Sequence, residues 1–199
     1  NLVFTGNDDD PDTLENLTAM GFKRPRDVSA IIRGWHSGRV PPTKSSRARE
    51  ILTRLMPSLL GALARATDPD EALIRFNQFL ERLPAGVQFF SLLQSNDNAL
   101  KLLVDIVGVA PRLSAWLSRN AQLVDILIET RPTSDHGDDF AVDNVLDFAD
   151  ILDALRLDVH HSQFRTGVFL LANPTNFQIA GTQFADIARR SISRLLSAV

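Results

Sequence analysis

The chain has 199 residues, 44% hydrophobic and 23% charged, a composition typical of a globular protein with enough apolar content to bury a core. It contains no cysteine, which excludes disulfide bonds, thiolate metal ligands and cysteine nucleophiles, and fits a cytoplasmic location. The formal net charge of −3 gives no overall attraction to nucleic acid, and no apolar run approaches the ~20 residues that cross a membrane.

Residues 1–44 are predicted to form an N-terminal helical linker. Asp9 or Asp10 is the candidate cap of a first helix, and Gly21 fits the position just after its end. Pro25 is the predicted start of a second helix, which a proline-rich stretch ends.

Residues 45–130 are predicted to form a central helical bundle. Apolar residues recur there at intervals of three and four, and the connections between periodic segments are short. Pro57 lies inside the first of these segments, where we expect a kink or a break. The candidate helix caps are Ser45 or Ser46, Asp68, Asn96 and Asn120, and the side chains predicted to be buried are Leu55, Leu63, Phe76, Phe79, Leu103 and Leu127.

Residues 131–142 interrupt the helical pattern. Pro, Ser, Asp and Gly gather there, which predicts an exposed loop. The periodicity returns in residues 143–199, although the run 159–172 fits either a short strand or a buried helix. The predicted fold class is therefore all-α, a multi-helix bundle with a C-terminal helical extension.

The charges are distributed unevenly along the chain. The stretch Lys23–Arg54, called the basic stretch below, has nine Lys and Arg residues against two carboxylates. The stretch Asp135–His160 has eight Asp residues against one Arg. Such asymmetry indicates contacts with a partner or docking between the two stretches.

Neither a catalytic nor a metal-binding motif stands out. The string Gly137-Asp138-Asp139 lacks the serine and the Asp-x-Asp spacing with which nucleotidyltransferases hold magnesium. Asp158, His160 and His161 carry ligand atoms, but neighbouring positions on a helix diverge. We expect no catalytic residue and no metal site in the chain.

The most unusual composition lies around a tryptophan in the basic stretch. A tryptophan flanked by cations is typical of binding hot spots for protein partners. Alternatively, Trp35 belongs to the core, one turn after two isoleucines, and the cations form a solvated face. The candidate partner-binding residues are Arg33, Trp35, His36, Arg39, Lys44, Arg47 and Arg49.

A different reading of residues 25–66 is a helix-turn-helix module that binds nucleic acid. Two predicted helices and the cluster of cations favour it. The net negative charge of the chain and its acidic flanks argue against it, and we expect no nucleic-acid partner.

Several segments resemble a known family. The segments AIIRGWHSGR (30–39) and SSRAREILTRLMPSLLGALARATDPDEALIRFNQFLERLPAG (45–86) are similar to the central region of bacterial glutamine synthetase adenylyltransferases. LVFTG near the start and PRLSAWLSRNAQLVDILIE (111–129) also resemble it, in the same order. The resemblance covers most of residues 2–130 and is looser after about residue 143, where the helices resemble those that open the family's second catalytic domain.

The resemblance implies a bifunctional enzyme that attaches AMP to glutamine synthetase and removes it, using ATP and magnesium under the control of PII signalling proteins. The catalytic Gly-Ser and Asp-x-Asp motifs of its two nucleotidyltransferase domains are expected outside this chain, so no catalytic residue and no cofactor is carried over. The resemblance thus implies a regulatory and linking segment, with glutamine synthetase and PII as partners.

Overall fold

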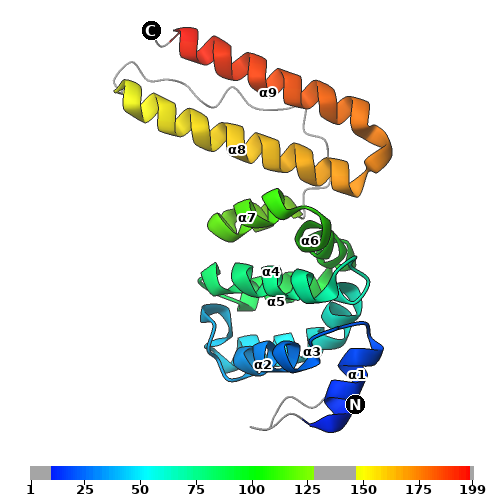
Figure 1. Cartoon of the computed structure of the whole chain (residues 1–199). Helices are drawn as coiled ribbons and strands as arrows, with labels where there is room; N and C mark the ends of the chain where they lie inside the picture. Colours follow the sequence, from blue (N-terminus) through cyan, green and yellow to red (C-terminus); the bar gives the residue numbers. More distant parts are fainter. Residues whose placement is uncertain (1–9, 128–146, 198–199) are drawn as a thin grey trace. The chain divides into compact units, whose positions relative to one another are not determined.

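The structure is a computed structural model that describes residues 10–127 and 147–197. Within these ranges every regular element is a helix and none is a strand, which confirms the predicted all-α fold class (Figure 1). The chain divides into two compact units, residues 1–124 and residues 125–199, each of which is described by itself below. The predicted loop 131–142 lies outside the described residues.

The first unit contains seven α-helices joined by short connections. These are α1 (Pro11–Ala19), α2 (Pro25–His36), α3 (Ser46–Leu63), α4 (Pro69–Arg82), α5 (Val87–Ser95), α6 (Asp97–Val109) and α7 (Pro111–Arg119), with the 3-10 turns η1 (Pro41–Thr43) and η2 (Ala121–Leu127), the latter continuing into the second unit.

Four of the predicted capping side chains start helices, whereas the candidate cap Asn120 follows the end of α7, where its Nδ2 donates to the carbonyl of Trp116 at 3.3 Å. Asp10, Ser45, Asp68 and Asn96 each accept a hydrogen bond from the backbone N–H three residues ahead, at 3.0–3.1 Å. Each bond satisfies a donor that the first turn leaves without an intrahelical partner. Helix α3 continues through Pro57, so no break occurs there.

The helices of the first unit pack around α3 and α4. Helix α3 packs against α5 and α6, while α4 packs against α6 and α7. Helices α1 and α2, predicted as a linker, also join this unit, because α2 contacts both α3 and α4 (Figure 1). The core predictions hold, since Leu55, Leu63, Phe76, Phe79 and Leu103 are all at most 2% exposed, and Leu127 in η2 is also buried.

A chain of aromatic rings runs through this core. Trp35 of α2 meets Phe76 of α4 edge to face, with ring centroids 5.6 Å apart. Phe76 and Phe79 lie 6.4 Å apart, and Phe79 reaches Phe89 of α5 at 5.3 Å. Such pairs stabilise a core beyond their buried area, so this row joins three helices that are distant in sequence.

The second unit is an antiparallel hairpin of two long helices, α8 (Phe148–Ala172) and α9 (Phe177–Ser197) (Figure 1). The run 159–172 lies wholly within α8, which resolves the choice between strand and helix in favour of helix. Asp158 of α8 accepts a hydrogen bond of 3.0 Å from Arg194 of α9, which links the two helices.

Candidate partner-binding surface

The centre of the basic stretch is the turn between α2 and α3. Gly38 ends α2 with φ +77°, a left-handed conformation that glycine adopts without the strain of a side chain. The N–H of Arg39 then donates to the carbonyl of Gly34 at 3.0 Å, which reverses the chain. This reversal places the backbone of Gly38 against that of Thr43 and Lys44.

A second glycine, Gly86, packs closely against the 3-10 turn η1. A side chain at Gly86 would collide with the carbonyl of Pro42 and with the ring of Phe90, so only glycine fits. Pro42 and Thr43 are buried, while Lys44 immediately after them is exposed. The turn is therefore anchored on its inner side and presents its cations outward.

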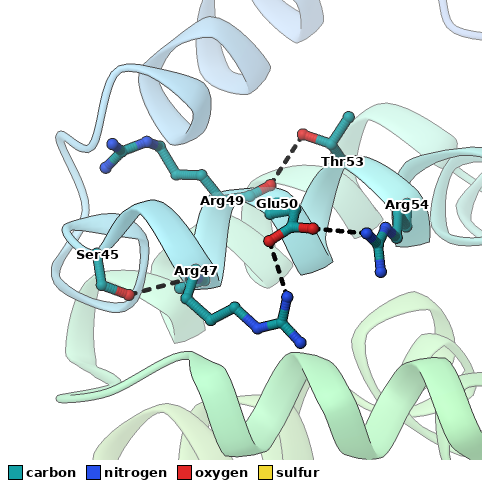
Figure 2. A network of polar contacts seen from close by, with 7 residues as sticks. Ser45, Arg47, Arg49, Glu50, Thr53 and Arg54 are labelled. Atoms are coloured by element: carbon teal, nitrogen blue, oxygen red, sulfur yellow. Dashed lines mark hydrogen bonds and ion pairs between the residues drawn. The ribbon is translucent and has the colours of Figure 1, made fainter.

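Arg49 clamps the same turn from α3. Its Nη1 donates hydrogen bonds of 2.8 Å to the carbonyls of both Thr43 and Lys44. Figure 2 shows its side chain extending away from Glu50, unlike the side chains of Arg47 and Arg54. Arg49 therefore holds the turn, and its guanidinium is engaged within the chain.

His36 lies beside this clamp at the end of α2. Its Nδ1 is 3.4 Å from the hydroxyl of Thr53, which donates to the carbonyl of Arg49 at 2.8 Å. Burial lowers the pKa of His36 below its ordinary 6.5, and the positive charge of Arg49 lowers it further. The folded protein thus favours neutral His36.

Two arginines on the exposed face of α3 share one carboxylate. Arg47 donates to Glu50 at 2.8 Å and Arg54 donates to it at 2.5 Å (Figure 2). The hydrogen bond from Arg47, followed by the charges of both arginines, lowers the pKa of Glu50. The three groups carry a combined charge of only +1, which leaves little for a phosphate backbone and weakens the helix-turn-helix alternative.

Of the two readings of Trp35, the structure confirms the core and removes the tryptophan from the candidate partner-binding surface. Its side chain is 0% exposed, and its Nε1–H donates to the Oδ1 of Asn77 at 2.8 Å. The Nδ2 of Asn77 in turn donates to Glu81 at 2.8 Å. Trp35 is therefore a core residue, because α4 supplies both an aromatic ring in edge-to-face contact and a hydrogen-bond acceptor for it.

The seven candidate residues thus fall into three groups. Trp35 is buried, while Arg33, His36 and Arg49 are half-buried. The exposed members are Arg39, Lys44 and Arg47, and among the described residues no acidic group lies within ion-pair distance of Arg39 or Lys44. These two residues extend from backbone segments that touch each other, so they form the core of the candidate surface.

The beginning of the basic stretch is held by a residue that the sequence did not single out. Asp70 of α4 is 3% exposed and accepts backbone hydrogen bonds from Lys23 at 2.8 Å and Arg24 at 3.0 Å. It holds the segment that leads into α2, although more than forty residues separate them in the chain. An acid in the first turn of α4 is already explained by the helix dipole, which is why this role gave no separate signal.

Two aspartates in the described part of the acidic stretch form ion pairs within the hairpin. Asp153 pairs with Arg156 at 3.0 Å within α8, and Asp158 pairs with Arg194 of α9. No group of three or more potential metal ligands occurs among the residues in 10–127 and 147–197, and Gly137–Asp139 lies outside them. None of the helices within those ranges is both long and apolar enough to cross a membrane.

Comparison with known proteins identifies relatives along the whole chain. It is 44% identical over 207 aligned residues to a protein of Mesorhizobium japonicum named bifunctional glutamine synthetase adenylyltransferase/adenylyl-removing enzyme, with 100% of this chain and 21% of the relative aligned. The protein of that name from Brucella melitensis is likewise 44% identical over 207 residues, with the same coverage. That from Caulobacter vibrioides is 37% identical over 200 residues, covering 99% of this chain and 20% of the relative.

The chain therefore spans about one fifth of the length of the curated relatives that it matches. No protein-family profile matches it, and neither does any solved structure.

Proposed function

The whole chain is homologous to a segment of the bifunctional glutamine synthetase adenylyltransferase/adenylyl-removing enzymes, and from this premise we propose that it is a non-catalytic regulatory and linking segment of such an enzyme. In this proposal it positions the catalytic domains that the resemblance implies and transmits partner binding between them. Such coupling requires a contact that differs between two states of the enzyme. ATP and magnesium are assigned to other segments of the enzyme.

The partner contact is assigned to the exposed cations Arg39, Lys44 and Arg47. Its main support is that Arg39 and Lys44 lie on a turn that is anchored by Gly86 and clamped by Arg49, without an acidic group of the described residues in ion-pair distance. A turn held before binding loses less conformational entropy when it binds. The chemistry fits an acidic protein surface, and glutamine synthetase, with PII as a second partner, is the proposed source of it.

The experiment reverses the charges of Arg39 and Lys44, which have no acidic group of the described residues within ion-pair distance. The double variant Arg39→Glu/Lys44→Glu is compared with Arg82→Glu/Lys101→Glu, which makes the same change of charge at exposed positions outside the basic stretch. Binding to immobilised glutamine synthetase is measured at low and high salt, and the measurement is repeated with PII. We expect the association rate of the first variant to fall roughly tenfold or more at low salt, because surface charges steer encounter.

The control variant and the melting temperatures separate a loss of the partner contact from a general effect of charge or a loss of folding. The control variant is expected to associate at nearly the rate of the unmodified chain, and both variants should melt within a few degrees of it. If the two variants associate with glutamine synthetase at equal rates, and also with PII at equal rates, the basic turn is not the partner contact. Binding to PII alone would retain the turn and exclude glutamine synthetase as its partner.

A further inference from the structure

Exposed apolar side chains are concentrated on the α8–α9 hairpin. Of the nine large hydrophobic side chains that are exposed among the described residues, seven belong to α8 or α9, and the other two are Val87 and Val109. The largest exposed fractions on α9 are those of Phe177 at 64%, Ile192 at 59% and Leu196 at 75%. This distribution sets α9 apart from every helix of the first unit.

These side chains share one face of α9. At 100° per residue, Phe177, Phe184, Ile192 and Leu196 fall within a face about 120° wide. Gly181, Ala185, Ala188 and Leu195 lie between them on this face, and none of them carries a charge. The first three are exposed and Leu195 is half-buried. We call these eight residues the apolar stripe.

The stripe is distinct from the face that α9 turns toward α8. Ala180 and Ile187 are the buried residues of α9, and Arg194 pairs with Asp158 beside them. In the described part of the chain, α9 therefore has one apolar face that packs against α8 and a second apolar face whose side chains are exposed. Contiguous apolar patches on soluble proteins mark interaction sites.

The length of the relatives indicates what covers the stripe. The hairpin lies inside the region of homology, which includes 100% of this chain but only 21% of the Mesorhizobium japonicum relative. About four fifths of such an enzyme is therefore available in the same polypeptide, where a covering segment pays no cost of bimolecular association. An amphipathic helix that packs on this face places its own apolar side chains between those of the stripe.

We propose that an amphipathic helix from outside residues 1–199 of the full-length enzyme packs on the apolar stripe of α9, so that the hairpin is part of a larger helical bundle. The inference rests on the homology to a longer enzyme and is independent of the partner contact assigned to the basic turn. It concerns a surface that contains neither a cation of that turn nor a candidate catalytic group.

The test uses the absence of cysteine in this chain to place single reactive thiols. Ile192→Cys lies on the stripe, and Ser193→Cys, one residue later on an exposed side of α9, is its matched control. Each is placed in the 199-residue chain and in the full-length enzyme with its other cysteines replaced, and the rate of maleimide labelling is measured. Phe184→Cys provides a second stripe position in case Ile192→Cys perturbs the helix, and circular dichroism checks that each variant folds.

In the dilute 199-residue chain we expect stripe and control thiols to react at similar rates. In the full-length enzyme we expect the stripe thiols to react at least about tenfold more slowly than the control, since they become accessible only when the bundle opens. Equal labelling of stripe and control in the full-length enzyme would overturn the proposal.

Two other occupants give different results. Protection of the stripe in the 199-residue chain that increases with its concentration would show that a second copy covers it. Protection of the full-length enzyme that arises only when phosphatidylglycerol vesicles are added would show that a lipid surface does so. Either result would contradict the proposal.

Discussion

The residues in 10–124 and the hairpin α8–α9 are both helical, but they differ in where their apolar side chains lie. In the first region Trp35, Phe76, Phe79 and Phe90 are at most 1% exposed, and neighbouring rings contact one another. In α9 only Ala180 and Ile187 are buried, while larger apolar side chains face outward. Helical periodicity alone therefore does not distinguish a helix that completes a core from one that awaits a partner.

The difference has a physical basis in the number of neighbours. Helices α3 and α4 each pack against several others, whereas α9 has a single long neighbour. Two antiparallel helices cannot enclose an amphipathic surface on all sides, and bundles need three or four. Substitutions of apolar residues should therefore change the free energy of unfolding strongly in the first region and only slightly on the outer face of the hairpin.

The largest contrast is expected between two phenylalanines. Phe76→Ala removes a fully buried ring and should lower the free energy of unfolding of the first region by roughly 3–5 kcal/mol. Phe184→Ala, at a side chain 39% exposed in α9, should change the free energy of unfolding of the hairpin by at most about 0.5 kcal/mol. Urea denaturation followed by circular dichroism reports on the helices of both regions, and tryptophan fluorescence reports on the first region alone, because Trp35 and Trp116 both lie in it. Similar losses for the two variants would contradict the contrast.

A smaller effect, with opposite signs, is expected at two glycines of the first region. Gly86→Ala must displace the backbone of Pro42 and should destabilise by about 1–3 kcal/mol. Gly61→Ala, inside α3 with open space around the added methyl group, should stabilise by about 0.5–1 kcal/mol. The same fluorescence measurement applies. A stabilising Gly86→Ala would show that the turn η1 is not held as tightly as described.

The smallest effect is a pH dependence at His36. Its pKa is lowered in the folded state by burial and by Arg49, so protonation favours the unfolded chain. Stability is therefore complete above about pH 6.5 and decreases as the pH falls below that value. His36→Gln should show a shallower decline of melting temperature between pH 7.5 and 5.5 than the unmodified chain, and the other histidines cancel in the comparison. Parallel curves would mean that the pKa of His36 is the same in the folded and the unfolded chain, which would contradict the lowered pKa.

Sequence patterns predicted the parts of the fold that depend on neighbours in the chain. The caps at Ser45, Asp68 and Asn96 are confirmed because a capping bond spans three residues. The end of α1 is likewise confirmed at Gly21, which has φ +103°. In contrast, the run 159–172 carries apolar residues on more than one face of α8, so its period alone left strand and helix open.

Contacts across long stretches of sequence could not be predicted in the same way. Three such contacts depend on how the helices meet: the bonds that Asp70 accepts from the backbone just before α2, the close approach of Gly86 to Pro42, and the hydrogen bond of Trp35 to Asn77. For the candidate surface, the cluster of cations was visible in the sequence, but not that Arg49 turns inward. The type of a residue gives its charge, whereas the tertiary structure decides where its side chain points.

Amide hydrogen exchange of the intact 199-residue chain tests most directly whether one region is self-sufficient and the other is open. The slowest amides should lie in α3, α4 and α6, and those of α9 should exchange at least about a hundredfold faster, because opening the hairpin requires less free energy than unfolding the core. Equal protection of α9 and α4 would show that the hairpin is as stable as the first region, and would contradict the account.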